Sequence, residues 1–381
     1  MVLTVICDVL GRENNGTTIA AMNLIRSMRE KGHTVRVVCP DEFRRGEKDY
    51  YVVPKLSLGP LNNYLEKNGV VGAKADRAVI REALEGADAV HFITPFLLTH
   101  RALKEARSMG LPITAGFHCQ AENFTTHLFL MNCRGINKLV YKAFYRQVYR
   151  YVDCIHYPTE FICRVFESET GHKTNHRVIS NGVDSMFRPA PVPKPKEFEG
   201  RFVILFTGRY SKEKSHPVLV EAANLSRHRD ELQLIFAGCG PQEEHIRKLS
   251  EKLPNAPLMR FFSRQELLDV INYSDLYVHP AEVEIEAIAC LEAISCGLVP
   301  VISDSPRSAT RYFAQSSRNL FKCGDPKDLA EKIDWWIEHP EERGSCSRSC
   351  CGYSKQFDFS HCMDEMERMI LENMEAVNEA R

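Results

Sequence analysis

The chain has 381 residues, with 49 lysines and arginines, 50 aspartates and glutamates, and a net charge of −1 at pH 7. This length predicts two domains that each bury a core, and the balanced charge excludes a general nucleic-acid binder. No apolar run reaches the roughly 18 residues that a membrane-spanning helix needs.

The N-terminus, MVLTVICDVL, enters a strand pattern at once and lacks the cationic lead and cleavage site of a signal peptide. We therefore expect a cytoplasmic protein, whose fourteen scattered cysteines are buried, reduced thiols. Zinc is the alternative for the densest group, although its spacing matches no usual paired motif and we expect no metal. The group comprises Cys346, Cys350, Cys351, His361 and Cys362.

The first half of the chain alternates apolar strand-like segments with helix-like ones. A stretch with apolar residues at helical spacing separates the first two strands and ends at a glycine. This alternation predicts a parallel sheet with helices on both faces. The expected strands are 3–9, 34–40, 89–94, 112–118, 153–159 and 176–183.

A basic and aromatic segment, 129–153, lies within this half, and no acidic residue occurs from 123 to 152. A helix with basic and aromatic faces is typical of proteins that lie in the interface of an anionic membrane. The alternative is an amphipathic helix whose apolar face packs on the sheet. The basic residues recur at every fourth position: Arg134, Lys138, Lys142, Arg146 and Arg150.

A proline-rich stretch, RPAPVPKPKEFEGR, then interrupts regular structure at 188–201 and predicts a semi-rigid linker. After it the alternation restarts with strands at 202–208, 232–240, 275–281 and 298–304. We therefore expect an α/β fold of two doubly wound, Rossmann-like domains facing across a cleft. The expected parts are an N-terminal domain (1–187), a linker (188–200), a C-terminal domain (201–358) and a helix packing back across the domains (359–381).

Two glycine-containing loops follow strands of the second domain. In TGRYSKEKS, Gly208 permits a tight turn, and Arg209 and Lys214 place two cations where they can clamp a diphosphate. In AGCGPQEE, Gly238 and Gly240 permit the close backbone approach of a ligand. The alternatives are a solvated basic loop and a simple turn.

A pair of glutamates, Glu284 and Glu292, follows the strand LYVHP. Their spacing of eight residues predicts that both carboxylates lie on roughly one face of a helix. The N-terminus of that helix would lie at the carboxyl edge of the sheet and favour a phosphate. Glu282 and Glu286 are expected to orient other groups or to lie on the surface, and a solvated face is the alternative for the pair itself.

GRYSKEK, GCGP and E-x₇-E, in this order and after these strands, resemble the donor half of the retaining glycosyltransferases of family 4, which have the two-Rossmann GT-B fold. The resemblance covers nearly the whole chain. It implies that Arg209 and Lys214 neutralise the nucleotide diphosphate, that Glu292 holds the ribose hydroxyls and that Glu284 contacts the transferred sugar.

The resemblance also implies site residues in the first domain. Gly16, in the turn NNGTT, matches the family's glycine loop, although a plain strand-to-helix turn is equally consistent. His118, in GFHCQAENFT, matches a histidine that contacts the transferred sugar, and a role as general base stays open. With Glu284, Arg209 and Lys214, His118 completes the expected catalytic set.

The sequence departs from the family pattern after Glu284. The family has Gly-Phe-Gly where this chain has Ile285, Glu286 and Ala287, which retain their backbone N–H groups as donor contacts but add a negative charge. No Asp-x-Asp triplet occurs in the chain. We therefore expect no metal and no cofactor, with arginine and lysine in the role that Mg²⁺ has in other enzymes.

His-Cys-Gln-Ala-Glu-Asn followed by the basic helix resembles the bacterial diacylglycerol glucosyltransferases within the family. SNGVD (180–184) and SPRSAT (305–310) add to the resemblance, with Ser305 to Ser308 expected over the donor pocket. It implies a retaining hexosyltransferase that moves glucose from UDP-glucose to diacylglycerol. The partners would be a UDP-sugar, a lipid acceptor and an anionic membrane, with the protein peripheral on the inner face of the cell membrane.

Three alternatives stay open. The acceptor of a family 4 enzyme can be a soluble or polyprenyl-linked saccharide. A sugar-nucleotide epimerase on the same fold class would act on the UDP-sugar alone. A non-catalytic UDP-sugar sensor would bind the donor without transfer or hydrolysis.

Overall fold

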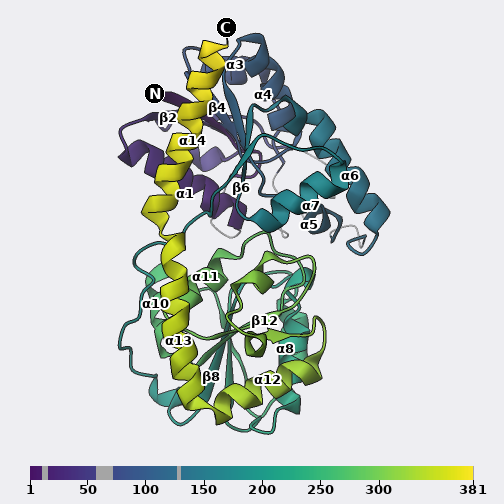
Figure 1. Ribbon diagram of the computed structural model, residues 1–381, viewed down its shortest axis with the longest axis vertical. Helices are drawn as coiled ribbons and strands as arrows, with labels where there is room; N and C mark the ends of the chain where they lie inside the picture. Colours follow the sequence, from purple (N-terminus) through teal and green to yellow (C-terminus); the bar gives the residue numbers. More distant parts are fainter. Residues whose placement is uncertain (11–15, 57–71, 127–129, 381) are drawn as a thin grey trace. The chain divides into compact units, whose positions relative to one another are not determined.

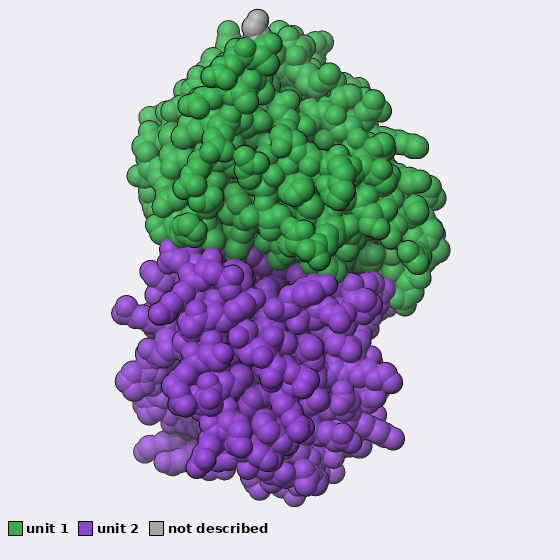
Figure 2. Space-filling view, viewed as in Figure 1, with its two compact units in different colours: residues 1–181, 360–381 green, residues 182–359 purple. Residues whose placement is uncertain are grey.

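The computed structural model describes residues 1–10, 16–56, 72–126 and 130–380. It divides into two compact units, which Figure 2 shows in separate colours. Unit 1 comprises residues 1–181 and 360–381, and unit 2 comprises residues 182–359. Each unit holds one parallel sheet with helices around it (Figure 1), which confirms the predicted α/β class with two Rossmann-like sheets.

The sheet of unit 1 has seven strands in the order β3-β2-β1-β4-β5-β6-β7. Six of them match the predicted strands. The seventh, β3, is a three-residue edge strand and too short to give a period in the sequence. The strands are β1 (Val2–Ile6), β2 (Thr34–Cys39), β3 (Tyr50–Val52), β4 (Ala89–Phe92), β5 (Ile113–Gly116), β6 (Cys154–Tyr157) and β7 (His176–Val178).

The helices of unit 1 include the C-terminal one, which packs on the same unit. Its Asp364 pairs with Lys31, its Glu367 lies 2.5 Å from His33 Nε2, and its methionine-rich face is buried. The helices are α1 (Gly16–Glu30), α3 (Arg77–Leu84), α4 (Leu97–Ser108), α5 (Ala121–Thr126), α6 (Arg134–Gln147), α7 (Glu160–Thr170) and α14 (Phe359–Glu379).

The sheet of unit 2 has six strands in the order β10-β9-β8-β11-β12-β13. The four central strands match the predictions, and the two short edge strands were missed. The strands are β8 (Phe202–Thr207), β9 (Leu232–Ala237), β10 (Leu258–Arg260), β11 (Leu276–His279), β12 (Pro300–Ser303) and β13 (Leu320–Phe321). The helices are α8 (His216–Leu225), α9 (Glu243–Ser250), α10 (Arg264–Tyr273), α11 (Ile288–Ser295), α12 (Pro326–Glu338) and α13 (Pro340–Ser354).

Both faces of the unit 2 sheet are buried. Val203 and Leu205 pack with α10, α11 and α13, whereas Ile204 and Phe206 pack with α8, α9 and α12. Figure 1 shows α10, α11 and α13 on one side of the strands and α8 and α12 on the other. Burial on both faces explains why these strands read as continuous apolar runs. Since all the strands are parallel, the loops that follow them meet at one edge of the sheet.

The proline-rich stretch belongs to unit 2. The Ala190 backbone N–H donates to Asn272 Oδ1 (2.8 Å), and Lys194 Nζ lies 2.5 Å from Asp275 Oδ2. The proline-rich stretch is therefore bound to the end of α10 and to the residue before β11 by a hydrogen bond and an ion pair.

Candidate active site

The glycine loops that follow β8 and β9 contact each other directly. The Tyr210 N–H donates to the Cys239 carbonyl (2.9 Å), and the contact leaves no room for side chains. A Cβ at Gly238 would lie 2.1 Å from the Gly208 oxygen, and one at Gly240 would lie 2.6 Å from the Tyr210 oxygen. This contact between loops already explains both glycines, and their approach to a ligand stays a prediction.

Glu284 does not lie on the helix that carries Glu292, so the prediction of a shared helical face is wrong. Helix α11 begins only at Ile288, and Glu284 pairs with Ser308 in an isolated parallel bridge. The reason is Ala287, whose left-handed backbone (φ 62°, ψ 70°) cannot belong to a right-handed helix. Glu284 therefore projects from a loop that is fixed to residues 305–309.

Two side chains bind the same carboxylate oxygen of Glu284. Lys214 Nζ donates to Oε1, and His279 Nε2 lies 3.1 Å from Oε1. Burial by itself would raise the pKa of Glu284, but Lys214 and His279 outweigh it and hold the pKa at about 2. Glu284 is therefore an anion at every physiological pH.

Arg209, the other expected cation, lies beside a buried acid of its own loop. Its guanidinium is 3.4 Å from Glu213 Oε1, which also accepts a hydrogen bond from Ser211 Oγ (2.5 Å). Arg209 and Glu213 are four residues apart in the loop after β8, so the loop orients its own arginine through this ion pair. Both expected cations, Arg209 and Lys214, are thus held by acids of unit 2.

Glu292 lies on α11 in an environment that differs from that of Glu284. Its nearest cation is Arg264 at the start of α10, with an N–O distance of 3.8 Å, and Arg264 also lies 3.6 Å from Asp184. Burial raises the pKa of Glu292 to about 7 despite Arg264. Glu292 therefore changes charge near neutral pH.

The turn between the two buried glutamates holds a third buried acid. Glu286 is only 3% exposed, so the suggestion that it lies on the surface is wrong. Ile285 and Ala287 on either side of it are half-buried, and Glu282 pairs with Arg307 (2.6 Å). Ser305 Oγ donates to the Glu282 carbonyl (2.6 Å), which binds the 305–308 segment to this turn.

His118 follows β5 in unit 1 and is half-buried. Its ring packs on Gly116, where a Cβ would lie 2.5 Å from Nε2, and its centroid is 5.4 Å from that of His156. Burial, together with His156 and His91, lowers the pKa of His118 well below its usual range. A neutral imidazole suits hydrogen bonding to a sugar hydroxyl better than neutralisation of charge.

Gly16 is the first residue of α1. The next residue, Thr17, donates its hydroxyl to the His118 carbonyl (3.2 Å), so the start of α1 lies beside the segment after β5. Residues 14 and 15 of the NNGTT turn lie outside the described part of the chain.

Helix α6 presents its basic residues outward and its aromatic residues inward. Tyr141 and Phe144 of α6 and Tyr149 just after it are buried, and the Tyr141 hydroxyl donates to Glu122 (2.7 Å). Tyr141 and Tyr149 pack against Phe117 in the core, which favours the alternative of an amphipathic helix with a packed apolar face, and membrane contact stays a prediction. The predicted cations are outside this core: Arg134, Lys138, Arg146 and Arg150 are exposed and Lys142 is half-buried.

The cationic stripe is shorter than its spacing predicts. Helix α6 ends at Gln147, and Arg150 lies in the following 3₁₀ turn (Tyr149–Tyr151), where it stacks on the Tyr151 ring at 4.8 Å. Leu139 is 66% exposed beside the stripe. Among the described residues, no helix is both long and apolar enough to cross a membrane.

Two residues of this site had no place in the sequence-based prediction: His279 and Arg264. His279 ends β11 in the motif His-Pro, five residues before Glu284, and that position at a strand end was the available signal. Arg264 is separated from Glu292 by a strand and a loop, and no sequence pattern joins them.

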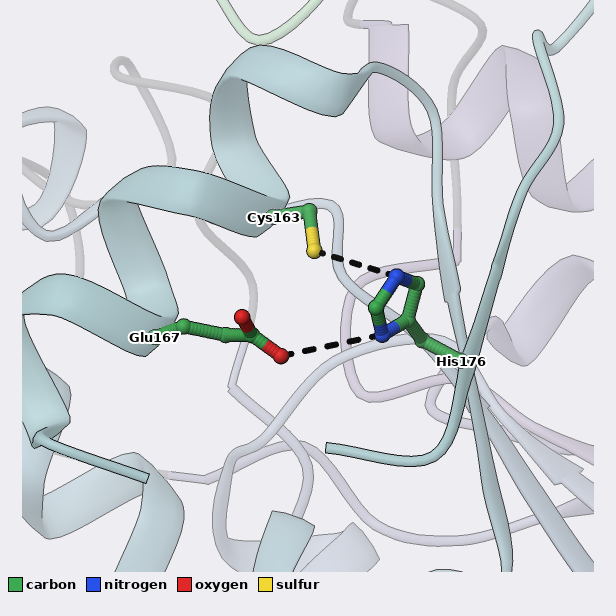
Figure 3. A group of neighbouring side chains, drawn as sticks. All are labelled: Cys163, Glu167 and His176. Carbon is green, nitrogen blue, oxygen red and sulfur yellow. Dashed lines mark hydrogen bonds and ion pairs between the residues drawn. The ribbon is translucent and has the colours of Figure 1, made fainter. Parts of the chain in front are cut away.

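Three side chains in unit 1 carry atoms that metals bind, although none was a predicted site residue (Figure 3). Cys163 Sγ lies 3.5 Å from His176 Nε2, whereas Glu167 Oε1 lies 3.7 Å from His176 Nδ1, so the two ring nitrogens face different partners. Glu167 also accepts from Lys173 (2.6 Å) and the Thr174 N–H (2.9 Å). Burial raises the pKa of Cys163 to about 12, so this network is best explained as an anchor for the loop after α7.

The cysteine group at the C-terminal end does not come together in one unit. Cys346, Cys350 and Cys351 belong to α13 in unit 2, whereas Cys362 belongs to unit 1. All fourteen cysteines are free thiols, but Cys133 and Cys239 are exposed, so the expectation of burial is wrong for these two.

Comparisons with known proteins agree with this arrangement. The family "Glycosyltransferase Family 4" matches residues 14–186, and "Glycosyl transferases group 1" matches residues 188–349. A GDP-mannose-dependent alpha-mannosyltransferase of Mycolicibacterium smegmatis is 26% identical over 84% of this chain and 85% of its own. The alpha-monoglucosyldiacylglycerol synthase of Streptococcus pneumoniae is 24% identical over 57% of this chain and 51% of its own.

The fold also matches a solved structure. Anabaena HepE in complex with UDP superposes with a TM-score of 0.74 at 16% identity, covering 98% of this chain and all of that one. At this identity the likeness concerns the fold alone.

Proposed function

The chain belongs to family 4 of the glycosyltransferases, and from this membership we propose that it is a retaining hexosyltransferase that moves glucose from UDP-glucose to diacylglycerol at an anionic membrane surface. The observation that carries the proposal is the Lys214–Glu284 pair at the carboxyl edge of the unit 2 sheet. It places a cation suited to a diphosphate beside an ionised carboxylate suited to sugar hydroxyls.

The proposed roles follow from where charge develops during transfer. The leaving diphosphate gains negative charge, which Arg209 and Lys214 stabilise once the donor draws them from Glu213 and Glu284. Glu284 then accepts hydrogen bonds from the sugar.

The remaining residues hold the donor in this scheme. Glu292 accepts hydrogen bonds from the ribose, and the backbone N–H groups of Ile285, Glu286 and Ala287 approach the sugar phosphate. Gly208, Gly238 and Gly240 shape the loops around it. In unit 1, Gly16 and neutral His118 contact the transferred sugar.

Two observations support the lipid acceptor. One of the relatives is named an alpha-monoglucosyldiacylglycerol synthase, and α6 exposes basic residues beside an exposed leucine. Such a surface attracts anionic headgroups, with each basic residue contributing about 1 kcal/mol. Access to a diacylglycerol hydroxyl requires that the protein lie on the bilayer.

A second candidate is favoured by another relative. A relative that matches over 84% of this chain and 85% of its own is named a GDP-mannose-dependent alpha-mannosyltransferase. A GDP-mannose donor with a soluble or polyprenyl-linked acceptor is therefore the alternative to be measured in parallel.

The test is a donor screen with product identification. Calorimetry with UDP-glucose and GDP-mannose, followed by mass spectrometry of products formed on diacylglycerol vesicles, is expected to give tight UDP-glucose binding and a monoglucosyl lipid. Transfer from GDP-mannose alone would contradict the donor assignment. Binding of UDP-glucose without transfer or hydrolysis would favour the sensor.

A matched pair of variants tests the site. Lys214→Ala is expected to lower turnover by about 10²-fold or more, because it removes a stabilising charge from the leaving diphosphate. Lys212→Ala removes an exposed lysine from the same 3₁₀ turn (Lys212–Lys214) and is expected to leave turnover within about threefold. Equal turnover in the two variants would contradict the site assignment.

A further inference from the structure

Tyr277, His279 and Glu284 form a chain of hydrogen-bonded side chains that ends at the Glu284 carboxylate. Tyr277 and His279 are two residues apart on β11, so their side chains share one face of the strand. The Tyr277 hydroxyl lies 3.2 Å from His279 Nδ1, and His279 Nε2 lies 3.1 Å from Glu284 Oε1. All three side chains are buried, with His279 only 1% exposed.

The direction of these hydrogen bonds follows from the chemistry of the end members. Glu284 is ionised, with a pKa of about 2, and can only accept, so His279 Nε2 carries the ring proton. Nδ1 is then an acceptor and receives a hydrogen bond from the Tyr277 hydroxyl. Burial raises the pKa of Tyr277 well above its usual range, so the hydroxyl keeps its proton. Burial also lowers the pKa of His279, which keeps the ring neutral.

His279 differs from Lys214, the other partner of Glu284, in its freedom to move. Lys214 has a flexible stem and is partly exposed, and the proposed function gives it the diphosphate as a second partner. The His279 ring is held edge-on to Phe206 at 5.4 Å and stacks with Tyr277 at 5.9 Å, on a strand that pairs on both sides. When Lys214 turns to the donor, His279 keeps its hydrogen bond to the Glu284 carboxylate.

We propose that His279 is a positioning residue that orients the Glu284 carboxylate toward the donor sugar, independently of Lys214. Tyr277 in turn fixes the tautomer of His279. The inference rests on the proposed function, in which Glu284 contacts the transferred sugar. It deepens that function by assigning the support of the carboxylate to two residues that touch no substrate.

The kinetic test compares variants of the intact protein with UDP-glucose. His279→Leu is expected to lower kcat by about 10- to 100-fold, the usual effect of losing a hydrogen bond to a charged group, with less than about threefold change in the donor KM. His279→Gln, which restores an N–H donor, is expected to recover much of the loss. Tyr277→Phe is expected to cause a smaller loss of the same kind.

A second buried histidine of unit 2 provides the control. His216 is as buried as His279, but neither ring nitrogen has a hydrogen-bond partner among the described residues. His216→Leu makes the same replacement without removing a hydrogen bond and is expected to leave kcat within about threefold. Equal losses in His279→Leu and His216→Leu, or no rescue by glutamine, would overturn the positioning role.

A spectroscopic readout separates this inference from the proposed function. Ring ¹⁵N spectra of histidine-labelled protein are expected to show His279 protonated at Nε2, hydrogen-bonded at Nδ1 and not titrating near neutral pH, identified by its loss in His279→Gln. The Nε2 signal is expected to persist when UDP binds. An Nδ1-protonated ring, or loss of the signal with UDP, overturns the inference even if the enzyme transfers sugar. If the protein shows the expected spectrum but transfers no sugar, the proposed function is contradicted and the hydrogen bonds of His279 are not.

Discussion

Ala287 is a residue whose backbone conformation conflicts with its side chain. Its φ of 62° lies in the left-handed region, and it is one of three non-glycine residues there among those described, together with Asp49 and Ser215. Alanine has no polar side chain to stabilise this conformation, which costs about 1–2 kcal/mol relative to the right-handed one. The family pattern has glycine at this position, and the turn keeps its geometry here at the expense of stability.

Ala287→Gly is therefore expected to raise the free energy of unfolding by about 1 kcal/mol, measured by urea denaturation. The matched control is Ala289→Gly, two residues further on within α11, which is expected to lower it by about 1 kcal/mol because glycine is a poor helix former. A decrease in both variants would show that Ala287 is not strained.

Glu284 and Glu292 are chemically identical but carry different charges near neutral pH. The pKa of Glu284 is about 2, because two hydrogen-bonding partners overcome its burial. The pKa of Glu292 is about 7, because burial outweighs the attraction of Arg264, whose N–O distance is 3.8 Å. Of these two glutamates, Glu292 is the one that can make donor binding depend on pH in the neutral range.

Donor affinity is expected to rise with pH for this reason. In the proposed site an ionised Glu292 would accept hydrogen bonds from both ribose hydroxyls, so we expect the Kd for UDP-glucose to fall about tenfold from pH 6 to pH 8 and then level off. Calorimetry of Glu292→Gln is expected to show weaker, pH-independent binding. Glu284→Gln should keep the slope, and a flat wild-type profile would argue against the ribose contact.

At the scale of the element, the basic and aromatic segment around α6 serves both the core and the surface of unit 1. The aromatic residues are needed in the unit 1 core, where Phe117, Tyr141 and Tyr149 pack together. The basic residues remain outside because their charges cannot be buried without partners. The helix is thus amphipathic in the ordinary sense, with an outer face that is positively charged.

Membrane binding through this face is expected to be electrostatic. Lys138→Glu with Arg146→Glu should weaken flotation with phosphatidylglycerol vesicles by about 10- to 100-fold, since each basic residue contributes about 1 kcal/mol. The control, Lys248→Glu with Lys252→Glu, makes the same change of net charge at exposed positions of unit 2. Equal binding of the two double variants would exclude α6 as the contact.

At the scale of the whole molecule, the two units are built differently along the chain. Unit 2 is one continuous segment, 182–359, with core clusters on both faces of its sheet. Unit 1 needs two segments, because residues 360–381 return to it and bury Met363, Met366 and Ile370. The chain therefore completes unit 1 only after all of unit 2 has been made.

Residues 182–359 are accordingly expected to fold alone, with a cooperative thermal transition. They should bind UDP within about tenfold of the intact chain, because the proposed diphosphate and ribose contacts all lie in unit 2. Residues 1–181 without α14 are expected to aggregate, because each buried apolar side chain of that helix contributes about 1.5–3 kcal/mol. A non-cooperative unit 2 would contradict this division.

Periodicity and motif order were sufficient to predict the central strands of both sheets, the α/β class and the family. Each central strand lies within an apolar run of the sequence, and the two glycine loops of unit 2 follow β8 and β9 directly. The edge strands β3, β10 and β13 have two or three residues and no period, so the sequence could not reveal them. The start of α11 was misplaced because alanine is normally a helix former and gave no signal of a left-handed turn.

The sequence by itself determined which residue types follow which strands, since that order is local. Only the tertiary structure decided what those residues touch. Lys214 reaches Glu284 across 70 positions of the chain, and Arg264 reaches Glu292 from another helix. The charge of each glutamate depends on such partners and on burial, which are set by packing between distant segments. Two glutamates eight residues apart are therefore equivalent in the sequence but have pKa values near 2 and near 7 in the folded protein.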